Sequence, residues 1–391
     1  MTENRNCTAK MGTVPSLTLA LSQREREGVR VMLPAFLFRA VEFDGSRLRI
    51  LDQTALPHRT KYLCPRSAVE VAQIIKRLSV RGAPAIGVAA AYGLAVEARR
   101  LPDAGLKRGL AAAAETLINS RPTAVNLKWA VLRVMQSVSE KGLPRLSAEE
   151  NRGCTQLPLS PVSLRRAVLA EAQKVEFEEI ARSLAMARLG SKLLKKNAVV
   201  LTICNTGALA APGMGTALGV VFRAHLDGKR PKVYACETRP LLQGSRLTTL
   251  ECQRAKIPVT LIADSAAANV IEKCNLVLVG ADRIAANGDT ANKVGTKMLA
   301  TIARAAKKPF YVVAPTSTFD LATPNGAEII VEERDGEEVR SFAGCRAAPQ
   351  GVPVFNPAFD VTPARLITGF ITDRGILRPP CRGAIRRILA G

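Results

Sequence analysis

The chain has 391 residues, of which 47% are hydrophobic, and this is enough for two domains and a sizeable core. Its apolar runs all fall well short of the roughly 18 residues of a membrane span, so the sequence predicts no membrane segment. The formal net charge is +23, which is compatible with nucleic acid or an anionic surface as a partner. The Lys and Arg residues are scattered, however, and only four Tyr and one Trp are available to stack on bases. We therefore interpret the charge as a solvated basic surface and expect no specific nucleic-acid partner.

Cysteine and histidine usage narrows the possible chemistry. The nine Cys are odd in number and form no CxxC pair, which argues against a disulfide framework and for a reducing compartment. We therefore expect a cytoplasmic protein, with nuclear presence left open. His58 and His225 are the only histidines and lie far apart in the sequence. This excludes a His-rich metal site and disfavours His-based general catalysis.

The first third of the chain is predicted to be mainly helical. Residues 1–36 show no sustained periodicity and are expected to be a disordered extension, and acidic residues in this stretch weigh against a mitochondrial presequence. A helical domain is expected over 37–141, opened by a β-hairpin in which apolar and polar residues alternate around Asp44-Gly45.

Helix boundaries in this domain can be read from capping signals. Ser67 and Glu70 form a capping box that opens a helix, which we expect to end at Arg81–Gly82. Pro84 then opens the next helix. Further helices are expected over 105–119 and 125–139.

The second half shows a regular alternation of strands and helices. Residues 142–163 are rich in Pro, Ser and Gly and suggest a linker or insertion, followed by a connecting helix over 164–197. Over 198–391, short apolar β-branched runs separated by helical segments predict a parallel sheet covered on both faces. The fold class is thus α/β, with a mainly helical N-terminal domain followed by a Rossmann-like catalytic domain.

Polar or reactive residues follow the predicted strands at the edge where open α/β sheets bind ligands. They are Cys204, Glu237, Asp264, Asp282 and Pro315. Cys204, before a Gly-permitted turn, is either a reactive thiol or a buried structural cysteine. Asp282 is either an acid–base group with a pKa raised by desolvation or an ordinary capping residue.

Several further residues suit an anionic ligand. Asn292 and Lys293 are expected to begin the helix after Asp282, where a lysine opposes the helix dipole unless an anion lies nearby. The segment Arg81-Gly82-Ala83 and, separately, Arg121 precede helix N-termini and could bind phosphate or simply be surface arginines at turns.

A glycine-rich stretch offers a different interpretation. GMGTALG at 213–219, with Glu237 ending the next strand, resembles a loosened dinucleotide-binding fingerprint. Roughly ten residues separate it from its strand, however, and the fingerprint should follow its strand directly. The signal is weak.

Together these motifs resemble one family, the methylthioribose-1-phosphate isomerases of methionine salvage. The resemblance covers about residues 40–380 in the family's order, and the first 36 residues and 142–163 depart from it. It rests on RGAPAIGVAAAYG, RPTAVNLKWA, LTICNTGALA, ETRPLLQGSRLT, GADRIAANGDTANKVGT, PFYVVAPTSTFDL and FNPAFDVTPARLITGFITDRG.

The resemblance implies a role for each motif residue. The catalytic pair would be Cys204 and Asp282. The substrate would be bound by Arg81, Gly82, Ala83, Arg121, Gln243, Asn292 and Lys293. The family further implies a sugar-phosphate substrate, a homodimer and no metal or other cofactor.

The implied reaction converts 5-methylthioribose 1-phosphate to 5-methylthioribulose 1-phosphate. Phosphate on the anomeric carbon prevents spontaneous ring opening, so an acid–base pair in a water-poor pocket would be needed. Proton transfer and hydride transfer both remain open, as does the question of which catalytic residue is the acid. Alternatives are isomerisation of a related sugar phosphate such as ribose 1,5-bisphosphate, or the role of a non-catalytic regulatory relative in an initiation-factor exchange complex.

Overall fold

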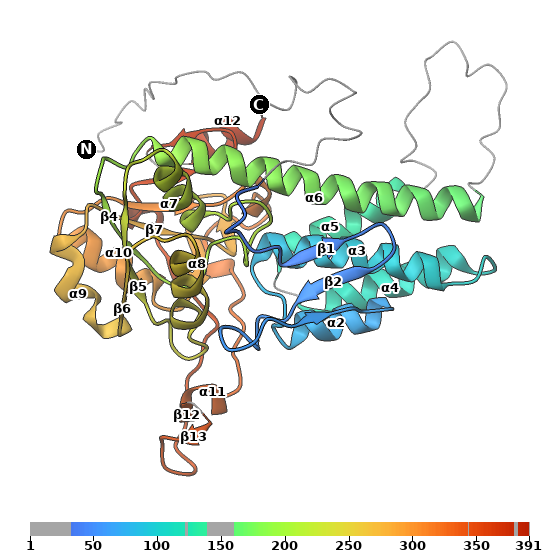
Figure 1. The fold of residues 1–391 in the computed structure, drawn as a ribbon, viewed down its shortest axis with the longest axis horizontal. Coiled ribbons are helices and arrows are strands. Elements are labelled where there is room, and N and C mark those ends of the chain that lie inside the picture. Colours follow the sequence, from blue (N-terminus) through green and yellow to red (C-terminus); the bar gives the residue numbers. More distant parts are fainter. Residues whose placement is uncertain (1–32, 122–123, 139–159, 343, 379–381, 391) are drawn as a thin grey trace.

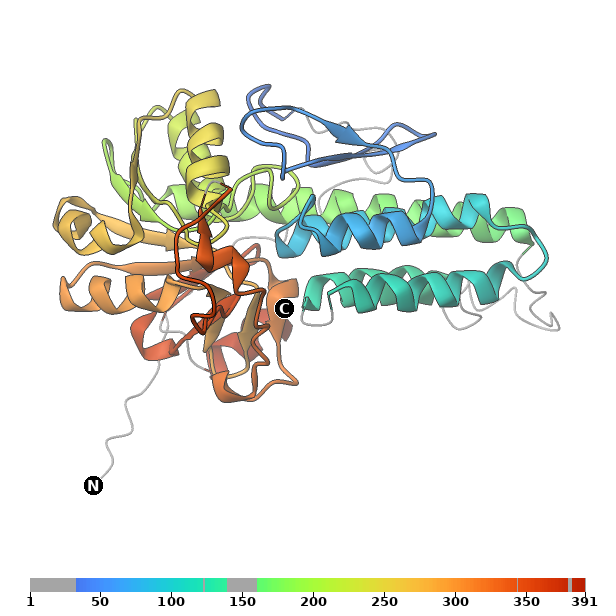
Figure 2. The ribbon, with the colours of Figure 1, turned by 90° about the horizontal axis from the view of Figure 1, so that it is seen from below.

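The computed structural model describes residues 33–121, 124–138, 160–342, 344–378 and 382–390. A helical part and a sheet part lie side by side, and the long helix α6 (Pro161–Ser191) runs along both (Figures 1 and 2). The predicted fold class is confirmed: a helical N-terminal part precedes a mainly parallel sheet covered by helices.

The helical part is built around α3 (Ala83–Arg100), which is buried along most of its length. Its core is aliphatic and alanine-rich, so neighbouring helices pack closely on α3. The helices around it are α2 (Ala68–Lys76), α4 (Leu106–Ser120), α5 (Val125–Ser137) and the first half of α6. An antiparallel sheet precedes them and confirms the predicted hairpin: β1 (Val41–Phe43), β2 (Leu48–Leu51) and β3 (Tyr62–Leu63).

The boundary between α2 and α3 differs from the prediction. The predicted cap is present, since the Glu70 N–H donates to Ser67 Oγ at 3.2 Å. However, α2 ends at Lys76 rather than Arg81–Gly82, because Leu78 has a left-handed φ of 62° that an α-helix excludes. Gly82 then opens α3 with φ 90°, and a Cβ there would lie 2.3 Å from the Ala210 carbonyl oxygen. A side chain at this position would therefore push the two parts apart.

Two segments that were expected to be irregular contain structured residues at their C-terminal ends. Residues 1–32 lie outside the described residues, but 33–36, expected to belong to the disordered extension, pack on the sheet part. The Phe36 ring meets Phe222 edge-on at 5.5 Å, so the apolar residues before Leu37 are part of the core. Within the expected linker 142–163, residues 142–159 are likewise outside the described range, whereas α6 already begins at Pro161.

The sheet part contains a seven-stranded sheet in the order β16-β15-β10-β7-β4-β5-β6. All neighbouring pairs are parallel except β15 and β16. The strands are β4 (Val199–Thr202), β5 (Lys232–Cys236), β6 (Val259–Ile262), β7 (Leu276–Val279), β10 (Phe310–Val313), β15 (Gly369–Ile371) and β16 (Ile376–Leu377). The chain leaves β4 in one direction and returns to its other side with β7, so the strand order reverses between these two strands. Open α/β sheets bind ligands at this point.

Helices cover both faces of this sheet. The second half of α6, α7 (Ala217–Leu226) and α8 (Thr249–Arg254) pack on one face, with the π-helix η2 (Gly244–Thr248) leading into α8. The other face is covered by α9 (Ala267–Val270), α10 (Thr296–Ala305) and α12 (Arg382–Ala390). The two covering layers explain why the strands are apolar on both sides.

A smaller sheet and a projecting arm follow β7. The sheet has the order β11-β8-β9-β14 and consists of β8 (Arg283–Ala285), β9 (Thr290–Lys293), β11 (Phe319–Asp320) and β14 (Phe359–Thr362). Residues 330–342 and 344–357 form the arm, which Figure 1 shows below the body with α11 (Glu337–Arg340), β12 (Ser341–Phe342) and β13 (Cys345–Arg346).

The prediction that a helix begins at Asn292–Lys293 is wrong. Both residues lie in β9, which pairs antiparallel with β8 and with β14. The Asn287-Gly288-Asp289 stretch is a hairpin turn, in which the Ala285 N–H donates to the Asp289 carbonyl at 2.9 Å. Helix α10 starts only at Thr296, after Gly295 with φ 101°. The helix-dipole argument for Lys293 is therefore wrong.

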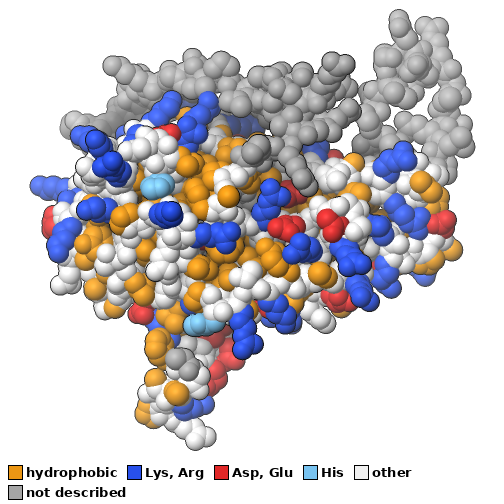
Figure 3. All heavy atoms as spheres, viewed as in Figure 1, with side chains coloured by type: hydrophobic (Ala, Val, Ile, Leu, Met, Phe, Trp, Pro, Cys, Tyr) orange, Lys and Arg blue, Asp and Glu red, His pale blue; other side chains and the backbone are white. Residues whose placement is uncertain are grey.

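None of the described helices has both the length and the apolar character needed to cross a membrane. On the face drawn in Figure 3, Lys and Arg side chains are spread over both parts of the molecule and do not gather in one patch. This distribution agrees with a solvated basic surface.

Candidate functional site

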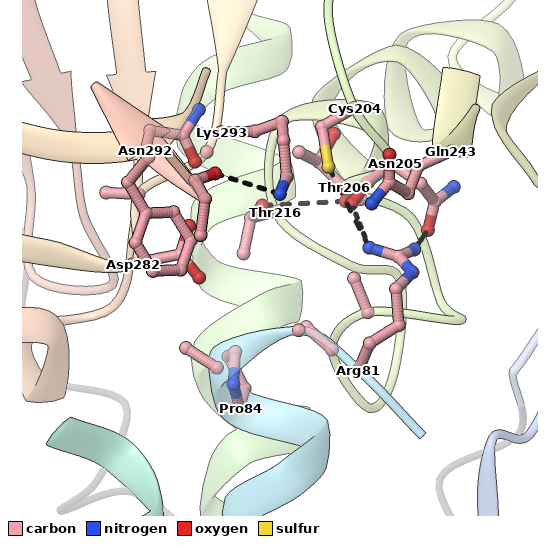
Figure 4. A pocket seen from close by; sticks show the side chains of 18 of the residues that line it. Arg81, Pro84, Cys204, Asn205, Thr206, Thr216, Gln243, Asp282, Asn292 and Lys293 are labelled. Atoms are coloured by element: carbon pink, nitrogen blue, oxygen red, sulfur yellow. Dashed lines mark hydrogen bonds between the residues drawn. The ribbon is translucent and has the colours of Figure 1, made fainter. Parts of the chain in front are cut away.

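A cavity lies where the helical part meets the carboxyl ends of β4 and β7. Its lining includes all the catalytic and substrate-binding residues that the family resemblance implies: Arg81, Gly82, Ala83, Arg121, Cys204, Gln243, Asp282, Asn292 and Lys293. Figure 4 shows the Cys204 sulfur, the Arg81 guanidinium and the Lys293 amino group directed toward the same space. The site thus lies at the point of strand-order reversal and is completed by the N-terminus of α3.

Cys204 is held in a strained backbone conformation two residues after β4. Its φ is 64°, which is uncommon for a residue with a side chain and marks positions fixed by their surroundings. The Cys204 N–H donates to Thr238 Oγ1 at 2.8 Å, and Thr248 Oγ1 donates to the Cys204 carbonyl at 2.6 Å. These two bonds fix the backbone, and the thiol faces the cavity.

Arg81 is held by hydrogen bonds to the loop after β4. Its Nη1 donates to the Asn205 carbonyl at 3.1 Å and lies 4.0 Å from Cys204 Sγ, while Nη2 donates to Asn205 Oδ1. Arg81 is only 8% exposed, and burial lowers the pKa of its guanidinium against the opposing charges of Cys204 and Glu251. Its Nε is buried with no partner among the described residues. Such a donor suits an anionic ligand.

Asp282 and Lys293 form the opposite wall. Burial raises the pKa of the Asp282 carboxyl, and the charges of Lys293, Arg121 and Arg81 oppose the rise. Burial also lowers the pKa of Lys293, whereas the charges of Cys204 and Asp282 raise it and so partly offset this effect. Lys293 Nζ donates to the Ala358 carbonyl at 2.9 Å and lies over the Phe359 ring. A shielded carboxyl with a raised pKa keeps its proton to higher pH than an exposed one, which suits a proton-transfer group.

Arg121 enters the cavity from the end of α4. Its Nη2 lies 3.4 Å from Glu332 Oε2, and Glu332 Oε1 in turn lies 3.1 Å from Arg334 Nη1. Both arginines line the cavity, so a carboxylate from the root of the arm sits between two pocket cations.

The remaining predicted residues also lie at the cavity wall. Gln243, just before η2, is buried with no partner for its Oε1 among the described residues. Asn292 Nδ2 donates to Thr296 Oγ1 at 2.9 Å. Of the other residues that follow strands, Pro315 lines the cavity, whereas Asp264 accepts the N–H groups of Thr238 and Arg239. Asp264 therefore lies at the sheet edge that the sequence predicts, but the structure places it outside the cavity lining.

Several pocket residues were not anticipated from the sequence. Asn205 stands next to Cys204 in TICNTG, and its position directly after the predicted catalytic cysteine is a signal that could have found it. Arg334 belongs to the arm and carries no comparable motif. Glu251 lies behind the cavity on α8, and only the structure shows that this carboxylate is buried and needs partners.

The glycine-rich stretch 213–219 has a packing explanation. A Cβ on Gly215 would lie 2.4 Å from the Gly207 backbone, and one on Gly213 would lie 2.2 Å from Ser183 Oγ. Both glycines have positive φ angles. Within the described residues, no three His, Cys, Asp or Glu side chains are grouped to hold a metal ion.

Comparisons with known proteins agree with the motifs. The sequence model of the initiation factor 2 subunit family matches residues 79–379. A methylthioribose-1-phosphate isomerase of Pelotomaculum thermopropionicum is 51% identical over 349 residues, which cover 88% of this chain and 92% of the relative. One of a Thermoanaerobacter species is 47% identical over 90% of this chain and 99% of its own length.

Solved structures extend the comparison to the fold. The 5-methylthioribose 1-phosphate isomerase of Pyrococcus horikoshii superposes with a TM-score of 0.79 at 41% identity, covering 90% of this chain and 96% of that one. A protein of A. fulgidus named translation initiation factor eIF-2B, subunit delta, gives a TM-score of 0.77 at 39% identity, covering 90% and 100%. The chain therefore belongs to the initiation factor 2 subunit family and, within it, to the methylthioribose-1-phosphate isomerases.

Proposed function

We propose that the protein is an aldose–ketose isomerase that converts 5-methylthioribose 1-phosphate to 5-methylthioribulose 1-phosphate. The observation that carries this proposal is the cavity itself, which joins a thiol, a shielded carboxyl and four cationic side chains at one point. The isomerases that are about half identical in sequence support the choice of substrate.

Asp282 is proposed as the proton donor to the ring oxygen. Phosphate on the anomeric carbon blocks spontaneous opening of the furanose, so ring opening needs an acid. A carboxyl whose pKa is raised by burial retains its proton to higher pH than an exposed one. Ring opening then exposes C1 and C2 to transfer of hydrogen between them.

Cys204 is proposed to act on that second step. Its thiol faces the cavity, and Arg81 Nη1 at 4.0 Å stabilises negative charge that develops there. The strained backbone keeps the sulfur at one place relative to the substrate carbons. Both a proton-transfer and a hydride-transfer route use this arrangement.

The substrate phosphate is proposed to bind between the N-terminus of α3 and the two arginines. Gly82 and Ala83 bring the positive end of an 18-residue helix to the cavity, and Arg81 and Arg121 approach from either side. Gln243, Asn292 and Lys293 supply further polar contacts along the sugar. Clamping the phosphate fixes the reacting carbons against Cys204 and Asp282.

An apolar recess beside the cavity favours a methylthio group over a second phosphate. It shares Ala83, Arg121, Asp282 and Phe359 with the main cavity. The aliphatic side chains that line it are Ile86, Ala124, Ala291, Ile329 and Ile330. The two arginines of the recess, Arg121 and Arg283, are paired with Glu332 and Asp320. A doubly charged phosphate would therefore lose hydration there in competition with these carboxylates, whereas a methylthio group would gain apolar contact.

The decisive experiment offers methylthioribose 1-phosphate to the purified protein and follows ketose formation. Ribose 1,5-bisphosphate serves as the competing substrate, and we expect a much lower kcat/KM for it. Absence of turnover with either sugar phosphate would instead favour a regulatory role, as the name of the A. fulgidus relative suggests for that protein.

We further propose that the protein is a cytoplasmic homodimer. The cysteines of the described residues, Cys64, Cys204, Cys236, Cys252, Cys274 and Cys345, are all free, which suits a reducing compartment. Sedimentation of the full chain tests the oligomeric state, and microscopy of a tagged chain tests the location.

A further inference from the structure

One helical segment behind the cavity holds the loop that carries Cys204. The loop after β4 is contacted by Thr248, at the end of η2, and by Glu251, one turn later in α8. Thr248 bonds the Cys204 carbonyl, and the Leu209 N–H donates to Glu251 Oε1 at 3.2 Å. Residues 204–209 are therefore tied to one face of this segment at both ends.

Glu251 also determines how Asn205 is oriented. Asn205 Nδ2 donates to Glu251 Oε2 at 2.6 Å and to Thr248 Oγ1 at 3.3 Å. Since Glu251 and Thr248 both accept a hydrogen bond here, the Asn205 amide nitrogen must face α8, and the Asn205 amide oxygen must face the other way. That oxygen accepts from Arg81 Nη2. The carboxylate thus reaches the guanidinium through a single side chain.

The contacts from Glu251 through Asn205 to Arg81 are tightly packed, so these side chains have little room to move. Glu251 is 2% exposed and does not line the cavity. A Cβ on Gly207 would lie 2.2 Å from Glu251 Oε2, so the loop approaches the carboxylate as closely as only glycine allows. A carboxylate buried this deeply is costly unless it is fully bonded, and here its bonds lead to the pocket.

We propose that Glu251 is a positioning residue that, through Asn205, fixes the Arg81 guanidinium for the substrate phosphate. The inference rests on the proposed function only in requiring that the cavity binds a phosphate. Without the Glu251 carboxylate, the Asn205 amide can rotate, and Arg81 loses the acceptor that aims it. Affinity for phosphate should then fall because the guanidinium must be ordered at the moment of binding.

The test is a double-mutant cycle on Glu251→Gln and Arg81→Ala, with inorganic phosphate as the probe and calorimetry as the measurement. We expect Glu251→Gln to weaken phosphate binding about tenfold in the native background and less than about twofold in the Arg81→Ala background. In turnover assays the same variant should raise KM by a similar factor, with a smaller change in kcat.

Glu97→Gln is the matched control. Glu97 is also a buried carboxylate, accepting the Ala68 N–H at 2.8 Å, but it lies away from the cavity. Its replacement should leave phosphate affinity unchanged, even where it lowers thermal stability as much as Glu251→Gln does. If Glu251→Gln does not fold, Asn205→Ser also breaks the contact between Glu251 and Arg81. It should likewise weaken phosphate binding in the native background and much less in the Arg81→Ala background.

Additive effects of Glu251→Gln and Arg81→Ala would overturn the proposal, as would an unaltered phosphate affinity in both Glu251→Gln and Asn205→Ser. A native protein that binds no phosphate would overturn it too. A protein that binds phosphate but does not isomerise the sugar would refute the proposed function alone, and the cycle would still decide the role of Glu251.

Discussion

The two arginines of the cavity are held in different ways. Arg81 is fixed by hydrogen bonds to Asn205, which is itself bonded to the buried Glu251. Among the described residues, the Arg121 side chain is paired only with the partly exposed Glu332, at 3.4 Å. Neutral and charged bonds inside the protein hold a side chain in one place, whereas an exposed ion pair contributes little and is readily exchanged. The comparison suggests that one side of the cavity is preformed and the other adapts when the ligand arrives.

The largest effects should come from the groups between the two arginines. Cys204→Ser and Asp282→Asn should each lower kcat by about 10³-fold or more, because each removes a proposed proton-transfer group. Phosphate affinity should stay near the native value, since neither residue is proposed to hold the phosphate. Steady-state kinetics and calorimetry on the folded variants measure the two quantities. A variant with near-native kcat would remove that residue from the catalytic pair.

Burial of Glu251 should appear in the pH dependence of stability. Burial raises the pKa of this carboxyl from 4.5 to about 7, so between these values the folded state holds more protons than the unfolded state. The free energy of unfolding should therefore fall by about 3 kcal/mol as the pH rises through this window. Chemical denaturation of the native protein and Glu251→Gln at several pH values measures the slope. Equal slopes for the two proteins would contradict the prediction.

Replacing the arginines one at a time compares the two sides directly. Arg81→Ala should weaken phosphate binding by about 100-fold and Arg121→Ala by about tenfold, because the preformed guanidinium loses less freedom on binding. Binding of inorganic phosphate to each variant is the measurement, with Arg47→Ala as the exposed control. Losses of equal size would remove the distinction between a preformed and an adaptable side.

The smallest effect is expected at Glu332, and it should have the opposite sign. Glu332→Gln frees Arg121 from a competing carboxylate, while Arg334 stays paired with Glu338, and it should tighten phosphate binding by about two- to fivefold. Glu337→Gln, which removes a carboxylate elsewhere on the arm, should have no such effect. The gain should shrink with added salt, which screens exposed charges. Weaker binding by Glu332→Gln would mean that the carboxylate supports the arginines and does not compete.

The strands and the strand-end residues could be predicted because they depend on local pattern. Apolar runs fixed the position of Cys204 and Asp282 at one sheet edge, and the structure brings both to the cavity. The strand at Asn292–Lys293 was missed because the preceding Asn-Gly-Asp turn permits either a hairpin or a helix, and pairing with β14 decides between them.

The contacts behind the pocket could not be predicted because they depend on distance in space. Asn205 and Glu251 are 46 residues apart in the sequence, and Arg121 and Glu332 are 211 apart. No periodicity or motif relates such positions. The resemblance to a family supplied the residues proposed to contact the substrate, whereas the groups proposed to position them emerged only from the packing of α8 and of the arm.

The length and continuity of helix α6 limit how the helical part and the sheet part can move relative to each other. It has 31 residues, packs on α3 in one part and on α7 in the other, and would measure about 46 Å as an ideal helix. Helices bend gently, and sharp kinks need a proline, a bulge or an inserted group. Its only proline is Pro161, in the first turn. The helical part and the sheet part are therefore joined by one continuous helix. A hinge motion that closed one part onto the other would have to bend this helix.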